Sequence, residues 1–204
     1  PPAAAAAAAP GPIPLLRYHG RDIVPELAER HRRAWGEEGG PMPSYVAATF
    51  STGDLANDRI PKGYDIIVCR HVLFHNPNDV VAEALKQFNQ SGASFLLATT
   101  LIHKGQDDEP NRNAIGEQTN PDVLSLGTIV NAELEFGVDT RAMDFGGYRP
   151  VALAAPPFLL PPPLAALPDS VGLPPQLGGW EQVLAVWELP LPPAPALSLL
   201  FTES

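Results

Sequence analysis

The prolines of this chain confine regular secondary structure to its middle. Of the 25 prolines, five fall within residues 1–14 and thirteen lie between Pro150 and Pro195. Because proline lacks a backbone N–H and interrupts helices, the two ends are expected to be extended or irregular. We interpret residues 1–16, which are mostly alanine and proline, as a low-complexity tail. Residues 17–204 are expected to form one domain, with residues 102–165 as an acidic and proline-rich cap over it.

The amino-acid composition limits the kinds of molecule that the chain is expected to bind. The net charge of −10 and the pI near 4.8 argue against a nucleic-acid backbone or an anionic membrane as partner, since both need a basic surface. No stretch of the sequence has the length and apolarity of a transmembrane segment. Cys69 is the only cysteine, which excludes an internal disulfide and favours a cytoplasmic setting. Its place in an apolar run predicts a buried, unreactive thiol.

The middle of the chain alternates between two periodicities. Period-two or continuous apolar runs predict strands, and apolar residues at helical spacing predict helices. The predicted order is strand 18–23, helix 24–35, strand 45–50, a strand around 66–69, helix 77–90, strand 94–101 and a last strand at 181–191. This alternation is typical of the α/β class with a Rossmann-like, doubly wound, mostly parallel sheet.

The segment "YDIIVCRHVLFHN", residues 64–76, changes from apolar to polar within a few residues. The run Ile66–Val68 predicts a central strand covered on both faces. Arg70, His71 and His75 follow it, where open α/β sheets bind their ligands, outside the carboxyl ends of the strands. Asn76 is expected to cap the helix that follows.

This segment, together with "YHGRDIVPEL" and "FSTGDL", resembles the class I S-adenosylmethionine-dependent methyltransferases. The resemblance is closest to a branch of small methyltransferases with a strand ending "LCRDVLxHL", a later "GGWRPLNLxxPPFxxPPP" and a final "LxLWRLPL". Here these parts read "GGYRPVALAAPPFLLPPP" at residues 146–163 and "LAVWELPL" at residues 184–191. The resemblance implies a methyl transferase that uses S-adenosylmethionine and acts on a small-molecule acceptor.

The resemblance also implies a set of cofactor-binding residues: Asp22, Ile23, Asp54, Leu55, Arg70 and His71. Asp22 would accept hydrogen bonds from the ribose hydroxyls, and Asp54 would lie near the adenine amine with Leu55 beside the ring. The segment from Arg70 to His75 would lie under the methionine half of the cofactor. The alternatives are a helix-terminal carboxylate for Asp22 and a turn-forming residue for Asp54.

For the acceptor side, the resemblance makes His75 the candidate catalytic residue, because imidazole titrates near neutral pH and can orient or deprotonate a hydroxyl. A histidine that caps a helix or merely packs is the alternative. Phe145, Tyr148 and Phe158 would wall the acceptor pocket, or would simply pack the proline-rich segment. A metal held by His71 and His75 is not expected, since no third ligand is evident.

One part of the family pattern is missing from the sequence. The glycine-rich loop that binds the methionine end of the cofactor should lie 20 to 30 residues before Tyr18, roughly one strand-turn-helix unit, together with the first, central strand. Only "PPAAAAAAAPGPIPLLR" stands there. We therefore expect a sheet that is incomplete at its N-terminal side, in a piece of a longer protein. The competing hypotheses are a truncated or degenerate methyltransferase fold acting as a non-catalytic binding module, and a nicotinamide-dependent dehydrogenase.

Overall fold

A computed structural model describes residues 16–36, 42–43, 45–103, 151–169 and 180–192. Residues 1–15 of the predicted tail, most of the predicted cap, and the candidate pocket residues Phe145 and Tyr148 lie outside this description, whereas Leu16 belongs to a strand. The chain forms two compact units, Pro1–Asp58 and Arg59–Ser204, called here the N-terminal and C-terminal units.

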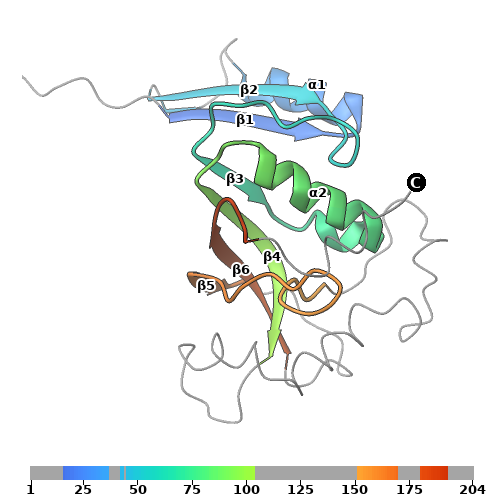
Figure 1. Cartoon of the computed structure of the whole chain (residues 1–204). Coiled ribbons are helices and arrows are strands. Elements are labelled where there is room, and N and C mark those ends of the chain that lie inside the picture. Colours follow the sequence, from blue (N-terminus) through green and yellow to red (C-terminus); the bar gives the residue numbers. More distant parts are fainter. Residues whose placement is uncertain (1–15, 37–41, 44, 104–150, 170–179, 193–204) are drawn as a thin grey trace, which may run out of the picture. The chain divides into compact units, whose positions relative to one another are not determined.

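The N-terminal unit is a two-stranded parallel sheet with a helix packed along it (Figure 1). It contains β1 (Leu16–Asp22), α1 (Pro25–Trp35) and β2 (Val46–Thr52). Leu16 is paired with Val46 at one end of the sheet, and Asp22 with Thr52 at the carboxyl end. The predicted strand, helix and strand of this region are confirmed, with bounds shifted by one or two residues.

Helix α1 ends where the sequence predicts and begins one residue later. Pro25 lies in its first turn, where the missing N–H costs nothing, and Gly36 closes it by donating its N–H to the Arg32 carbonyl at 2.9 Å. The predicted apolar stripe is only partly buried: Ala28 is 2% exposed, whereas Trp35 is 42% exposed. The His31 ring instead stacks on Phe50 of β2 at 5.6 Å between centroids.

The C-terminal unit contains a four-stranded mixed sheet in the order β3-β4-β6-β5. Its strands are β3 (Ile66–Cys69), β4 (Phe95–His103), β5 (Ala165–Pro168) and β6 (Trp180–Glu188). β3 runs parallel to β4, and β6 runs antiparallel to both of its neighbours. The α/β class with parallel strand pairs is therefore confirmed. The short β5 was not predicted, because it lies in the proline-rich segment.

Helix α2 (Asn78–Gln90) follows β3 through a short 3-10 turn, Leu73–His75. Its predicted apolar face is confirmed: Val81, Ala84, Leu85 and Phe88 are each 1% exposed or less. The prediction that Asn76 caps the N-terminus of this helix is wrong. Asn76 donates from Nδ2 to the Val72 carbonyl at 2.7 Å, within the preceding turn, and the helix has no side-chain cap.

The segment 151–163 is packed against β4. The Leu101 amide donates to the Val151 carbonyl at 2.8 Å. Trp187 on β6 donates from its indole nitrogen to the Pro161 carbonyl, also at 2.8 Å. Phe158 is wholly buried, so its ring contributes to the core, and burial of such a side chain stabilises by about 1.5–3 kcal/mol. Packing is thus the role of Phe158 here.

The prediction that Ile66–Val68 is covered on both faces is wrong for the described residues. Ile66 and Val68 are 52% and 61% exposed, while Ile67 between them is half-buried. The reason is that β3 is an edge strand, hydrogen-bonded to β4 alone among the strands that the structure describes. The apolar run predicted the strand correctly but not its neighbours.

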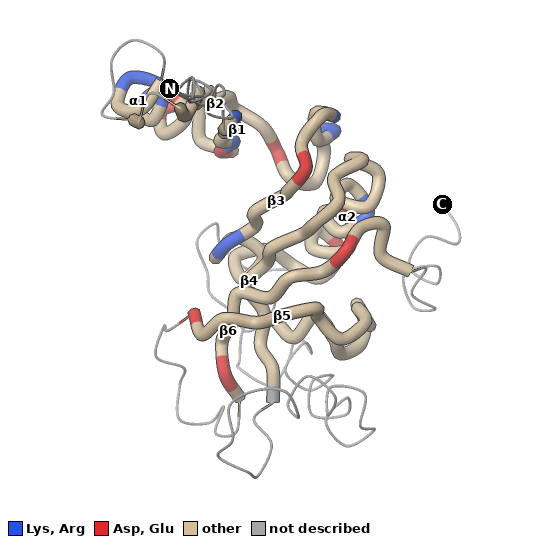
Figure 2. The backbone as a smooth tube through the Cα atoms, turned by 90° about the vertical axis from the view of Figure 1, so that its left-hand side faces the viewer, with Lys and Arg blue, Asp and Glu red and all other residues tan. Residues whose placement is uncertain are grey.

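The charged residues are distributed unevenly along the backbone (Figure 2). They are dense on α1, whereas β4 carries no Lys, Arg, Asp or Glu. Among the described residues, no helix combines the length and apolarity needed to cross a bilayer. One residue of this uncharged strand, Thr99, forms hydrogen bonds with the Asp169 side chain and the His71 amide, which are described next.

Candidate functional site

A buried carboxylate, Asp169, lies immediately after β5 in the C-terminal unit. Its side chain is only 5% exposed. The Asp169 amide donates to the Gln182 carbonyl at 3.0 Å, and Gln182 Nε2 donates to the Asp169 carbonyl at 3.1 Å. The backbone and the side chain of Gln182, on β6, thus hold Asp169 in position at the end of β5.

Three side chains from β4 and the end of β3 converge on the Asp169 carboxylate. Arg70 donates from Nη2 and Nε to Oδ1 at 2.8 and 3.2 Å. His71 Nε2 lies 2.8 Å from Oδ2, and Thr99 Oγ1 donates to the same oxygen at 3.2 Å. We call Arg70, His71, Thr99, Asp169 and Gln182 the Asp169 cluster.

An unusual backbone conformation allows two consecutive residues to reach one carboxylate. Neighbouring side chains of a strand point to opposite faces, but His71 has a φ of +57°, in the left-handed region that non-glycine residues rarely adopt. The chain therefore turns sharply at the end of β3. The His71 amide donates to Thr99 Oγ1 at 3.0 Å, which holds the turn against β4. Strained positions of this kind are concentrated at functional sites.

The cluster keeps its carboxylate ionised in spite of burial. The hydrogen bond from Arg70 holds the pKa of Asp169 below its usual value, and the contacts with His71 and Thr99 act in the same direction. Burial acts the other way, because it disfavours the charged form. Since the lowering prevails, Asp169 is a carboxylate at neutral pH and can only accept hydrogen bonds.

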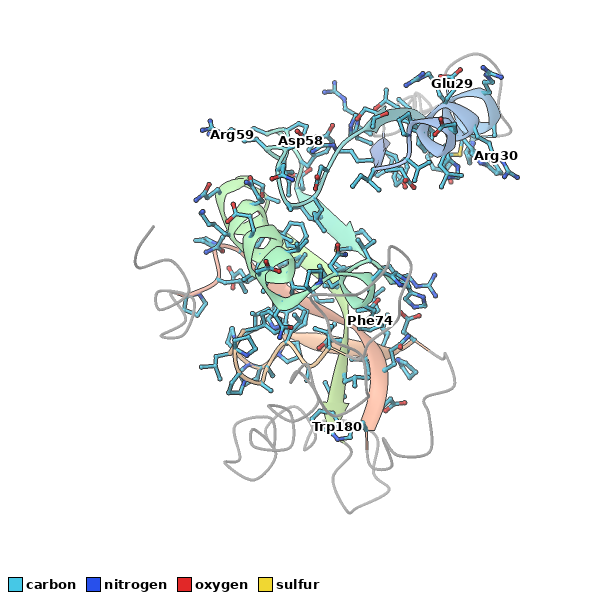
Figure 3. The ribbon with its side chains drawn as sticks, turned by 90° about the vertical axis from the view of Figure 1, so that its right-hand side faces the viewer. Glu29, Arg30, Asp58, Arg59, Phe74 and Trp180 are labelled. Carbon is cyan, nitrogen blue, oxygen red and sulfur yellow. The ribbon has the colours of Figure 1, made fainter. Side chains whose placement is uncertain are left out.

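His75, the predicted catalytic residue, follows His71 by four residues in the chain. It ends the 3-10 turn, its side chain is exposed, and its amide donates to the Val72 carbonyl at 3.1 Å. Phe74, the residue before His75, is buried and labelled in Figure 3, and its ring centroid lies 6.3 Å from that of His71. The structure thus places His71 beside a charged partner, the Asp169 carboxylate.

Asp22 and Ile23 occupy the carboxyl end of β1 in the N-terminal unit. Asp22 Oδ1 accepts a hydrogen bond from the Val24 amide at 2.8 Å, just before α1 begins. The alternative interpretation, in which Asp22 is a carboxylate at the N-terminus of the following helix, predicts a contact of this kind. A carboxylate has about four acceptor positions, so the bond does not exhaust its capacity for hydroxyl donors. The neighbouring Ile23 presents a side chain that is 45% exposed.

Asp54 and Leu55 lie in the turn after β2. Asp54 Oδ1 accepts from the Ala56 amide and Oδ2 from Asn57 Nδ2, both at 2.8 Å. These bonds, that of Asn57 first, lower the pKa of Asp54. They are the contacts of a turn-forming aspartate, which was the alternative interpretation. Leu55 beside it is half-buried.

The sequence reasoning missed Asp169, Thr99 and Gln182. Asp169 is 98 residues from His71 in the chain and belongs to no motif, and the strand that positions it was not predicted. Thr99 carried a usable signal, because a hydroxyl inside the apolar strand "FLLATTL" needs a polar partner when buried. Within the described part of the chain, no three His, Cys, Asp or Glu side chains are grouped so that they could hold a metal ion.

Comparison with known proteins yields no family model and no curated relative that matches the chain. Solved structures do resemble it. The S-adenosylmethionine-dependent methyltransferase SibL is 12% identical, with a TM-score of 0.44 over 86% of this chain and 43% of its own. The mitomycin 7-O-methyltransferase MmcR is 17% identical, with a TM-score of 0.44 over 84% of this chain and 41% of its own.

A third solved structure is that of the magnesium protoporphyrin IX methyltransferase ChlM from Synechocystis PCC 6803. It is 13% identical, with a TM-score of 0.41 over 85% of this chain and 74% of its own. All three are methyltransferases, the class that the sequence resembles, and the present chain spans less than half the length of the first two.

Proposed function

We propose that the chain belongs to an S-adenosylmethionine-dependent methyltransferase that acts on a small-molecule acceptor. The sequence resemblance supplies the family. The observation that carries the proposal is the position of Arg70 and His71 at the carboxyl end of β3, oriented by the buried Asp169. Ligands of open α/β sheets bind at this edge.

The residues present fit the cofactor chemically. In the N-terminal unit, Asp22 retains acceptor capacity for the ribose hydroxyls, and the exposed Ile23 and half-buried Leu55 offer apolar surface for the adenine ring. Asp54, although engaged in its own turn, can accept a further hydrogen bond from the adenine amine. When bound, S-adenosylmethionine supplies a methyl group already activated by the positive sulfur.

With the methyl group activated in this way, the protein has to hold, orient and desolvate the reactants. Correct positioning alone can remove about 7–11 kcal/mol of a barrier. Residues on a sheet edge suit this task, because their backbone is fixed by strand pairing, and the Asp169 cluster adds side chains whose rotamers are fixed by mutual hydrogen bonds. Arg70, which is largely exposed while bound to the buried carboxylate, can contact a ligand with its remaining N–H groups.

The test is the transfer of a labelled methyl group from S-adenosylmethionine to a panel of small hydroxyl, amine and thiol compounds by the full chain. The proposal predicts label in an extractable product, and it predicts that S-adenosylhomocysteine inhibits the transfer. Heat-unfolded chain serves as the control. A folded chain that binds neither compound would contradict the proposal and favour a non-catalytic binding module.

A further inference from the structure

We propose that the polar face of the two-stranded sheet in the N-terminal unit binds a tetrahedral oxyanion, that is, a phosphate or sulfate group. The face is built by five residues, three on β1 and two on β2: Arg17, His19, Arg21, Thr49 and Ser51. We call it the His19 face. The inference does not depend on the methyl transfer proposed above, because none of these residues belongs to the candidate cofactor or acceptor sites.

The alternation of strand residues separates the His19 face from the face on which α1 packs. Phe50 of β2 lies on the helix side, since its ring centroid is 5.6 Å from that of His31 on α1. Neighbouring residues of a strand point to opposite faces, so positions 17, 19 and 21 of β1 and 49 and 51 of β2 lie on the side away from the helix. The same alternation places Asp22 on the helix side. Within β1 and β2, both described in full, the His19 face therefore has two arginines and no acid.

His19 lies between the two hydroxyl groups of this face. Its Nδ1 is 2.8 Å from Thr49 Oγ1, and its Nε2 is 2.9 Å from Ser51 Oγ. The register of the sheet explains both contacts, because His19 is paired with Thr49 and Ser51 lies two residues further along β2. Thr49 is exposed, whereas His19 and Ser51 are half-buried. A ligand can therefore reach this row of polar groups from solvent.

The number of hydrogens on the imidazole determines what the two hydroxyl groups can donate. A neutral imidazole has one N–H, so one ring nitrogen donates and the other accepts the hydrogen of its hydroxyl partner. An imidazolium donates from both nitrogens, which leaves both hydroxyl hydrogens for an acceptor outside the face. The remaining contact, from Thr49 Oγ1 to the Tyr18 carbonyl, is 3.4 Å long and weak. Protonation of His19 thus adds a hydroxyl donor to a face that already has two guanidinium groups.

The charges around His19 are arranged as an anion requires. The pKa of His19 is lowered, first by burial and then by the positive charge of Arg21. Arg17 is exposed two residues before His19 on the same face. The nearby acid is Asp58, whose Oδ2 lies 3.4 Å from Arg21 Nη2; β2 has no titratable residue, and α1 packs on the other face. A bound oxyanion counteracts the effect of Arg21 and favours the imidazolium, so anion and proton bind cooperatively.

The test uses the full chain and inorganic sulfate, with the ionic strength held constant by chloride. Sulfate keeps its charge over the pH range used, so a change in its binding with pH arises from the protein. We predict saturable binding, followed by NMR, that becomes about fivefold or more tighter as the pH falls from 8 to 5.5, and by the same coupling a rise in the pKa of His19 with sulfate.

His31, on the helix side of the same sheet, is the internal control, and its ring resonances should not respond to sulfate. Equal responses of His19 and His31, or a response that does not saturate, would overturn the proposal. Saturable binding with an affinity that does not change with pH would overturn the role given to His19.

Substitution of the arginine tests where the anion binds. Arg17→Ala should weaken sulfate binding about tenfold or more, because it removes a charged donor. Arg30→Ala removes an exposed arginine of α1 and should leave the affinity unchanged. The amide spectrum of each variant shows whether it is folded. Equal weakening by the two substitutions would mean that sulfate responds only to the overall charge of the unit, and would overturn the site.

The hydroxyl donors and the source of the anion are tested separately. Thr49→Val should weaken sulfate binding, whereas Thr52→Val, on the opposite face of the same strand, should not. Equal affinities of the two variants would overturn the role of the hydroxyl groups. Methyl phosphate is the second probe: if it competes with sulfate, the site accepts a phosphate group carried by a larger molecule, and if it does not, the ligand is the free inorganic anion.

Discussion

Nε2 of His71 lies 2.8 Å from Oδ2 of Asp169, although 98 residues separate them in the chain. The contact joins the end of β3 to the residue after β5, the two outer strands of the four-stranded sheet. Because Asp169 is buried and also binds Arg70 and Thr99, this relationship orders the sheet edge on which the proposed function depends. It is also accessible to experiment through pH, substitution and spectroscopy.

The first prediction concerns stability in acid. The pKa of Asp169 is lowered in the folded chain from its ordinary value of 3.8, so its ionised form favours folding. That contribution is fully present above the ordinary value and is lost as the pH falls through the lowered pKa. Asp169→Asn should therefore be less stable than wild type at neutral pH, and the difference should shrink in acid. Urea unfolding over a pH series measures this; parallel curves for the two proteins would contradict it.

The second prediction concerns the threonine that connects the pair. Thr99→Val removes the acceptor of the His71 amide and a donor to Asp169, and should destabilise the C-terminal unit by about 1–3 kcal/mol. Thr100→Val is the matched control, since Thr100 Oγ1 instead accepts from the Leu153 amide at 2.9 Å. We expect similar losses of stability by chemical unfolding, but altered His71 resonances in the Thr99 variant only. Altered His71 resonances in both variants would contradict the separation of the two roles.

The third prediction concerns Cys69, whose predicted burial is confirmed. Its side chain is 5% exposed, and burial raises the pKa of the thiol to about 12. Because the thiolate is the reactive form, the native chain should react with a thiol reagent far more slowly than the unfolded chain. The chain has one cysteine, so the signal is unambiguous. Rapid, complete labelling under native conditions would show that the strand opens readily.

Residues near one another in the chain were predicted well, and residues brought together by the fold were not. The periodicity of α2 predicted its buried face, because Val81, Ala84 and Phe88 are set by a local repeat. Apolar runs likewise predicted β3 and β4. Whether β3 lies in the centre or at the edge depends on which strands flank it, and a local pattern carries no information about that.

The same limit applies to the site. Arg70 and His71 were picked out because polar residues after a buried strand lie where ligands bind. Their partner Asp169 could not be found, since it is positioned by β5, a strand of four residues in a proline-rich segment. The left-handed turn at His71 was equally hidden, because histidine does not signal it as glycine would.

The fourth prediction concerns the N-terminal unit. A Cβ at Gly20 would lie 2.6 Å from Cδ1 of Phe50, whose ring is packed against His31. Gly20→Ala should therefore cost about 1–3 kcal/mol by overpacking. Gly53→Ala is the control, since the atoms nearest to its Cβ would belong to the end of the flexible Arg21 side chain, and its cost should stay below about 1 kcal/mol. Chemical unfolding compares the two, and equal losses would contradict the packing argument.

The most direct test of the proposed function is calorimetric titration of the full chain with S-adenosylhomocysteine. We predict saturable binding that Asp22→Ala weakens about tenfold or more, since hydrogen bonds to a charged group contribute about 1.5–3 kcal/mol. Glu26→Ala, which removes an exposed carboxylate from the first turn of α1, should bind like wild type. No binding by a folded chain, or equal binding by the Asp22 and Glu26 variants, would contradict the account.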